Sequence, residues 1–136
     1  MFEILEHTAD IGFRARARSL AELFESAAEA LVSIAIELED ISPRLDYSLT
    51  ATGHDTESLL VNWLNEVLYW MDGGQLAFRH FRVAEISHAN VSGTARGEPR
   101  DPARHRAKLI VKGITYHQLR IAQTTDGWFA EVYLDI

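Results

Sequence analysis

Two segments of this chain place apolar residues at helical spacing, and each lies between segments that alternate apolar and polar residues. The first follows Ser19, a capping residue with a glutamate three positions on, and should end near residue 36. The second begins at Asp55 or Thr56 and is ended by a pair of glycines. Two amphipathic helices of this kind need a flat apolar surface to cover, so the remaining segments are expected to form a sheet.

The other segments are rich in β-branched and aromatic residues or alternate at the strand period of two. Strands are predicted over residues 2–5, 13–18, 45–51, 78–86, 91–97, 109–121 and 129–134. A turn at residues 125–127 should join the last two as a hairpin. The predicted fold class is α+β, with a largely antiparallel or mixed sheet and both helices packed on one face, in a single domain over residues 1–136.

Thirteen basic and twenty acidic residues give the 136-residue chain a formal net charge of −7. A protein of that charge is not expected to bind RNA or an anionic membrane with its whole surface. The absence of cysteine excludes disulfides, thiolate nucleophiles and cysteine-ligated metals. No apolar stretch is long enough to span a bilayer, and the first residues lack a basic leader, so a cytoplasmic location is expected.

A polar stretch, Glu6-His7-Thr8-Ala9-Asp10-Ile11-Gly12, interrupts the two predicted strands at the start of the chain. Asp10 shares parity with the arginines of the following strand, so its side chain should point away from the core. An aspartate two residues before a glycine is also common in ordinary turns, where it bonds to nearby amides. Both interpretations stay open on this stretch alone.

The last nine residues predict a strand whose buried face includes Leu134 and Ile136. Asp135 then lies on the opposite face, together with Glu131 and Tyr133. If Ile136 is anchored in the core, its terminal carboxylate is held close to the Asp135 side chain, and like charges held that close need a cation or donors to offset them.

A metal site follows if the first loop brings Asp10 beside Asp135 and Ile136. Three carboxylates form an oxygen-only site, which suits a hard divalent ion such as calcium or magnesium. The alternative is a solvated chain end with no ion.

A second polar cluster interrupts the apolar residues 109–121. It contains Lys112, Thr115, Tyr116 and His117. A lysine within such a run is often an edge residue, but a dense polar group tends to mark a site or a partner surface.

Five blocks of this sequence, in order and along nearly its whole length, resemble the archease family. They are the stretch from Glu6 to Gly12, residues 59–66, Gly97-Glu98 with His105, residues 112–117, and the final Leu134-Asp135-Ile136. Gly113 departs from the alanine more usual in the family, at a position that carries none of these inferences.

The resemblance implies an accessory protein and not an enzyme. Archeases activate the RtcB-type RNA ligase of tRNA splicing, promoting guanylylation of the ligase and its multiple turnover and relaxing its nucleotide choice. The family's divalent-cation site, a calcium site with magnesium or manganese as alternatives, maps onto Asp10, Asp135 and Ile136. Its functional lysine maps onto Lys112. The expected partner is the ligase, with tRNA contacted only indirectly and neither DNA nor a membrane involved.

One alternative function is an RNA-binding module acting on tRNA. It would use Arg14, Arg16, Arg18 and residues 96–108, a proline-containing stretch rich in arginine that is predicted to be a mobile, locally basic loop.

A second alternative is a small metal-dependent phosphoester hydrolase built from His7, Asp10, Lys112 and His117. The sequence has no phosphate loop, zinc-binding helix or nucleophile elbow that would favour a known catalytic class. A general chaperone is a third, weaker hypothesis.

Overall fold

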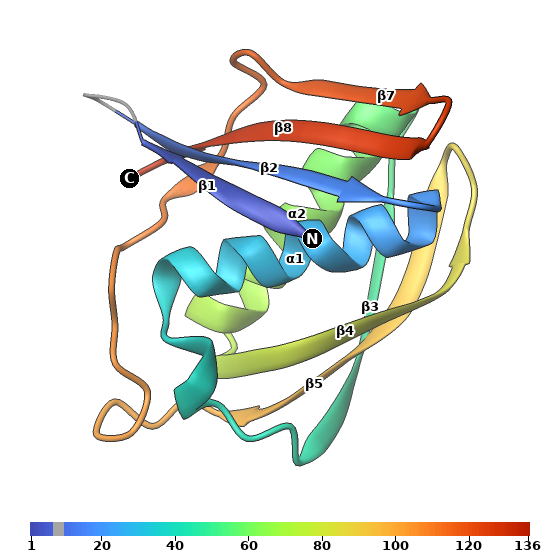
Figure 1. Cartoon of the computed structure of the whole chain (residues 1–136). Helices are drawn as coiled ribbons and strands as arrows, with labels where there is room; N and C mark the ends of the chain where they lie inside the picture. The colour runs from blue at the N-terminus through green and yellow to red at the C-terminus, as the bar shows by residue number, and fades with distance from the viewer. Residues whose placement is uncertain (7–9) are drawn as a thin grey trace.

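The computed structural model describes residues 1–6 and 10–136, and this part of the chain forms two antiparallel sheets and two α-helices (Figure 1). One sheet has five strands in the order β1-β2-β8-β6, with β7 also paired to β8, and the other has the order β3-β5-β4. The strands are β1 (Phe2–Glu6), β2 (Ile11–Ala17), β3 (Leu45–Thr52), β4 (Leu76–Ile86), β5 (Asn90–Pro99), β6 (Gly113–Ile114), β7 (Arg120–Thr124) and β8 (Gly127–Asp135). The predicted α+β class is confirmed, although the strands divide into two sheets.

Both helices begin at the predicted caps. Helix α1 (Leu20–Ala35) starts where the Ser19 hydroxyl accepts a hydrogen bond from the Glu22 amide at 3.2 Å. Helix α2 (Thr56–Asp72) starts where the Asp55 carboxylate accepts from the Ser58 amide at 2.7 Å. Each cap satisfies an amide that has no partner within its own helix, which explains why the boundaries could be predicted from the sequence.

The two helices lie between the two sheets (Figure 1). Helix α1 packs against β2 and β4, and α2 packs mainly against β3. Trp63 is fully buried, and its indole N–H donates to the Phe24 carbonyl at 3.1 Å, which links the helices to each other. Each sheet therefore has an inner face covered by helices and an outer face. The outer face of the five-stranded sheet carries the predicted site.

The long strand predicted over residues 109–121 is wrong. Only Gly113–Ile114 and Arg120–Thr124 are strands, and Ile110 is 80% exposed. The apolar composition did not produce one long strand, because β6 pairs with β8 over only two residues. The rest of that side of β8 is paired with β7. The predicted hairpin is confirmed, since Thr124 pairs with Gly127 at the β7–β8 turn.

Residues 96–108 were predicted to be a mobile, locally basic loop, but residues 96–99 belong to β5 and most of the charges in the segment are paired. The ion pairs are Arg96 with Asp46, Arg104 with Glu98, Arg106 with Asp40 and Lys108 with Glu37, at distances between 2.8 and 3.6 Å. The bonds fix the loop to the segments that follow α1. They also remove most of the positive charge that the RNA-binding alternative drew from this loop.

Glu98 is fully buried and makes several of the bonds that hold this segment in place. Its carboxylate accepts from the Ser42 amide and from His105 at 2.8 Å, and it pairs with Arg104 at 2.8 Å and with Arg44 at 2.9 Å. Hydrogen bonding from Arg104, together with the other donors, holds the pKa of Glu98 far below its usual range. This carboxylate is charged and fully engaged.

Candidate metal centre

The two predicted aspartates lie across from each other at one end of the β2–β8 pair. The antiparallel register runs to Ile11 opposite Leu134, so Asp10 and Asp135 are the next residues on either side. Asp135 is exposed and Asp10 is half-buried. Figure 1 shows the C-terminus beside the start of β2. Residues from the two ends of the sequence thus meet at one corner of the sheet.

Both aspartates belong to the outer face of the sheet. Gly12 and Tyr133 are register partners, and residues two apart on a strand share a face, so Asp10, Gly12, Tyr133 and Asp135 lie on the same side. The residues between them on each strand are buried apolar side chains of the core. The two carboxylates therefore point away from the helices.

Next to the two aspartates, Arg14, Glu131 and Tyr133 form a hydrogen-bonded group on the outer face of β2 and β8. Arg14 donates to Glu131 from Nη2 at 2.9 Å and from Nε at 3.1 Å, and the Tyr133 hydroxyl donates to the other oxygen of Glu131 at 3.2 Å. The Arg14 bonds lower the pKa of Glu131. Burial raises the pKa of Tyr133, and the charges of Glu131 and then Asp10 add to that effect. The phenol stays a donor while the glutamate stays charged.

Glu131 and Tyr133 lie on the face predicted for them, with Asp135, but they are buried there. They are 8% and 5% exposed, because Glu131 is bonded by Arg14 and by the Tyr133 hydroxyl and the Tyr133 ring lies against Gly12. The sequence does contain a signal for the pair, since Arg14 has the parity of the outer face and the charge opposite to Glu131. That signal needs the β2–β8 register, which the sequence alone did not supply.

Gly12 allows the tyrosine ring to lie against the backbone of β2. A Cβ atom added at Gly12 would come within 2.7 Å of Tyr133 Cδ1 and within 2.7 Å of the Val132 carbonyl oxygen. Real carbon atoms do not approach that closely, so any side chain here would displace the ring or the strand. The glycine of the polar stretch is thus explained by packing directly beside Asp10.

The second polar cluster reaches the same corner through β6. The Lys112 amide donates to the Asp135 carbonyl oxygen at 2.7 Å, which places this exposed lysine beside the aspartate pair. Thr115 is half-buried, and both its amide and its hydroxyl donate to the Tyr133 carbonyl at 3.1 Å. Thr115 therefore attaches the edge segment to β8.

The remaining predicted residues differ in what the structure says of them. Tyr116 is 57% exposed and His117 is also exposed. Ile136 was predicted to be anchored in the core, but it is 40% exposed, because the strands paired to β8 extend no further than Asp135. His7 lies outside the described residues.

The residues at this corner offer the oxygen ligands that a hard cation prefers, but too few of them to fill its coordination shell. Asp10, Asp135 and a main-chain oxygen of Ile136 are all oxygen donors, as calcium and magnesium prefer. Among the described residues, no group of three or more His, Cys, Asp or Glu side chains could hold a metal ion. A cation here would take its other ligands from water or from a partner.

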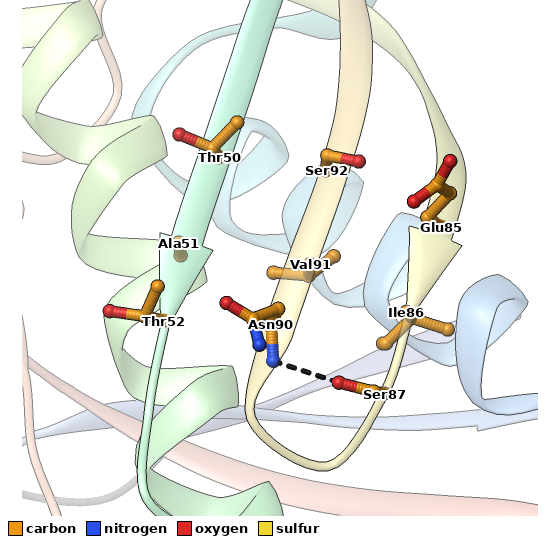
Figure 2. A pocket seen from close by; sticks show the side chains of 9 residues that line it. All are labelled: Thr50, Ala51, Thr52, Glu85, Ile86, Ser87, Asn90, Val91 and Ser92. Atoms are coloured by element: carbon orange, nitrogen blue, oxygen red, sulfur yellow. Dashed lines mark hydrogen bonds between the residues drawn. The ribbon is translucent and has the colours of Figure 1, made fainter.

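A hollow at the turn between β4 and β5 offers no comparable chemistry. It has a volume of about 280 Å³, and Figure 2 shows the nine side chains that line it. Most are small hydroxyl or aliphatic groups, and Ser87 accepts a hydrogen bond from the Asn90 amide at 3.1 Å. Among these nine residues Glu85 alone is charged, so the hollow presents neither a pair of carboxylates nor a cation.

The fold and the site define a class of small α+β protein with an acidic corner made from its two chain ends. The sequence profile of the Archease protein family matches residues 2–136, and the chain belongs to this family. The protein archease of Methanosarcina acetivorans is 40% identical over 139 residues, covering 99% of this chain and 95% of that protein. The protein archease of Sulfolobus acidocaldarius is 35% identical, covering 99% of this chain and 98% of that protein.

Solved structures agree with the fold. The solution structure of protein 1598 from Methanobacterium thermoautotrophicum superimposes with a TM-score of 0.83 at 29% identity, covering 99% of this chain and 98% of that one. The crystal structure of an archease from Thermotoga maritima, described as a possible chaperone, gives a TM-score of 0.67 at 21% identity, covering 97% and 94%. The second likeness concerns the fold alone. Within the described residues, no helix has the length and apolar character needed to cross a membrane.

Proposed function

We propose that this chain is an accessory activator of an RtcB-type tRNA-splicing RNA ligase, and that it acts through a divalent cation held by Asp10, Asp135 and Ile136. Calcium is the first expectation for the ion, with magnesium or manganese as alternatives, and the cytoplasm is the expected location. The observation that carries the proposal is the position of Asp10 opposite Asp135 on the outer face of the sheet. Membership of the archease family supports the choice of partner.

The two carboxylates are suited to an ion that is shared with a partner. Two aspartates and one main-chain oxygen provide fewer donors than the six to eight that calcium takes, so open positions face outward. When bound, such a cation neutralises phosphate oxygens, and phosphoryl transfer depends on that neutralisation. The contribution of Asp10 and Asp135 is to hold the ion at a fixed corner that the ligase can approach.

Lys112 would act from the adjacent segment. It is exposed, and its amide donates to the Asp135 carbonyl oxygen at 2.7 Å, so its main chain lies beside the acidic corner. A lysine ammonium is a compact point charge that binds phosphate or carboxylate without a fixed geometry. It would contact a nucleotide phosphate or an acidic side chain of the ligase. Tyr116 and His117, which are exposed a few residues on, would extend the same contact surface.

The test is a guanylylation assay with a purified cognate ligase and GTP, with and without this protein. Wild-type protein should accelerate formation of the guanylylated ligase, and the Asp10→Asn and Asp135→Asn variants should lose that stimulation. Asp126→Asn is the matched control, because Asp126 lies in the exposed turn at the other end of the same sheet. Full stimulation by both site variants would contradict the proposal.

The hydrolase alternative is tested with the same purified protein, by measuring phosphoester hydrolysis in the absence of the ligase. The activator proposal expects no turnover of phosphoesters by the protein alone, whether or not calcium is present. Turnover that is lost with a chelator and with Asp10→Asn would favour the hydrolase instead.

A further inference from the structure

Three guanidinium groups surround one aromatic ring on the outer face of the five-stranded sheet. The central carbon of Arg16 lies 4.9 Å from the centre of the Phe129 ring, that of Arg120 lies 5.3 Å away and that of Arg14 lies 5.9 Å away. The arginines come from β2 and β7, which flank β8 on its two sides. We call Arg14, Arg16, Arg120 and Phe129 the arginine patch.

Of the three cations, Arg14 alone forms an ion pair with a carboxylate of the described residues. Arg14 forms ion pairs with Glu131 at 2.9 Å and with Glu3 at 3.0 Å. Arg16 and Arg120 are exposed, and neither makes an ion pair with a carboxylate in the part of the chain that the structure describes. The patch thus holds two available guanidinium groups around one ring, in a chain whose net charge is −7.

Three cations gathered around one ring repel one another, and contact with the ring opposes that repulsion. An exposed cation over an aromatic face gains a modest electrostatic attraction to the ring. Elsewhere on the molecule, Arg96, Arg104 and Arg106 are each paired directly with a carboxylate. Arg120 faces Glu131, its register partner, and its charge adds to the bonds from Arg14 in lowering the pKa of that carboxyl. An anion bound from outside would therefore give Arg16 a direct partner and Arg120 a second one.

We propose that the arginine patch binds the phosphate backbone of single-stranded RNA. Nucleic acid can use both features of a guanidinium: phosphate oxygens accept its N–H groups, and unstacked bases stack on its plane. An acidic polypeptide would use only the N–H groups. A flat sheet face is also the surface on which single-stranded RNA is commonly spread, because its bases are free to stack.

The patch lies on the same strands as the acidic corner. Arg16 is six residues from Asp10 along β2, a separation of roughly 20 Å at about 3.3 Å per residue. An RNA strand on the patch would therefore lie within reach of whatever is bound at the corner. This inference differs from the expectation that tRNA is contacted only through the ligase. It does not depend on the proposed function, because it is tested on the isolated protein.

The test measures binding of a fluorescent single-stranded oligoribonucleotide to the full chain by anisotropy over a series of salt concentrations. Wild-type protein should bind at about 50 mM salt and weaken steeply as salt rises, since each neutralised phosphate adds about 0.7 to the slope of log affinity against log salt. The Arg16→Gln/Arg120→Gln double variant should weaken binding by about tenfold or more and reduce the slope by about 1.4.

Arg82→Gln is the matched control. Arg82 is an exposed strand arginine on the other sheet, paired in register with Thr94, and it should leave both affinity and slope unchanged. Circular dichroism of each variant reports whether it is folded. Amide chemical shifts of unmodified protein titrated with the oligonucleotide give a location without mutation, and the largest shifts should fall on β2, β7 and β8.

Three results would overturn the inference. One is no binding at low salt, and another is binding that the double variant retains in full. The third is stronger binding of an acidic peptide of equal charge at the same arginines, which would assign the patch to a protein partner.

Discussion

Glu98 and the Asp10–Asp135 pair are both acidic sites, but of the two only Glu98 is bonded by donors from the described residues. Glu98 is fully buried and accepts from two arginines, a histidine and an amide. Asp10 and Asp135 sit side by side at the sheet corner, where neither carboxylate bonds a donor from the described residues. The contrast shows that two acidic sites in one small fold can differ in the number of donors that face them.

The contrast predicts its largest effect at Glu98. Glu98→Gln keeps the shape but removes the charge that Arg104 and Arg44 face, so it should lower the free energy of unfolding by about 3–5 kcal/mol. Urea denaturation measures this directly. Glu57→Gln, at an exposed position on the first turn of α2, is the control and should change stability by no more than about 0.5 kcal/mol. A small loss at Glu98 would mean that its burial has no energetic role.

The pH dependence of stability should follow the same residue. The pKa of Glu98 is lowered by folding from an ordinary value of 4.5, so its contribution is complete above that value and is lost as pH falls toward the folded pKa. The stability difference between wild type and Glu98→Gln should therefore be constant at neutral pH and shrink below about pH 4.5. Urea titrations at several pH values give the comparison. A difference that grows on acidification would contradict the assigned direction.

Substitution of Gly12 should have an intermediate effect. Gly12→Ala puts a Cβ atom against the Tyr133 ring, so it should cost about 1–3 kcal/mol and weaken any cation site at Asp10. Gly113→Ala is the matched control, because a Cβ atom at Gly113 meets nothing within 4 Å and this residue is the register partner of Asp135. Thermal unfolding with and without calcium checks both variants. Equal behaviour of the two would show that the ring contact is unimportant.

The smallest effect on stability is expected at the acidic corner itself. Asp10→Asn and Asp135→Asn each remove one of two neighbouring like charges, so without a divalent ion they should change unfolding free energy by about 0.5 kcal/mol or less, toward greater stability. Chemical denaturation in the presence of a chelator is the measurement. A loss comparable to that of Glu98→Gln would make the pair structural, and the comparison would fail.

Local patterns predicted the local structure well. Ser19 and Asp55 fixed the helix starts because a cap depends on neighbours within three residues, and the buried positions of both helices follow their apolar periodicity. The hairpin at Thr124 and Gly127 has the same origin. Each of these features is decided by contacts between residues close together in the sequence.

What the sequence did not supply depends on contacts between distant segments. The division of the strands into two sheets, the pairing of Glu98 with Arg44 and the burial of Glu131 under Arg14 all require the tertiary arrangement. The apolar residues 109–111 were predicted to be part of a strand because their composition favours one, yet β8 pairs with this segment only at residues 113–114. Parity in the sequence assigned Asp10 and Asp135 to the outer face. Their proximity depends on the register between β2 and β8, which the sequence permits but does not determine.

The most direct measurement of the central claim is a calcium titration of the purified chain by isothermal calorimetry. Wild-type protein should bind one equivalent, and both Asp10→Asn and Asp135→Asn should lose that binding while Asp126→Asn keeps it. Saturating calcium at about one hundred times its dissociation constant should also stabilise the wild type by about 2.7 kcal/mol and the two site variants by far less. Undiminished binding in either site variant would contradict an ion shared by the two ends of the chain.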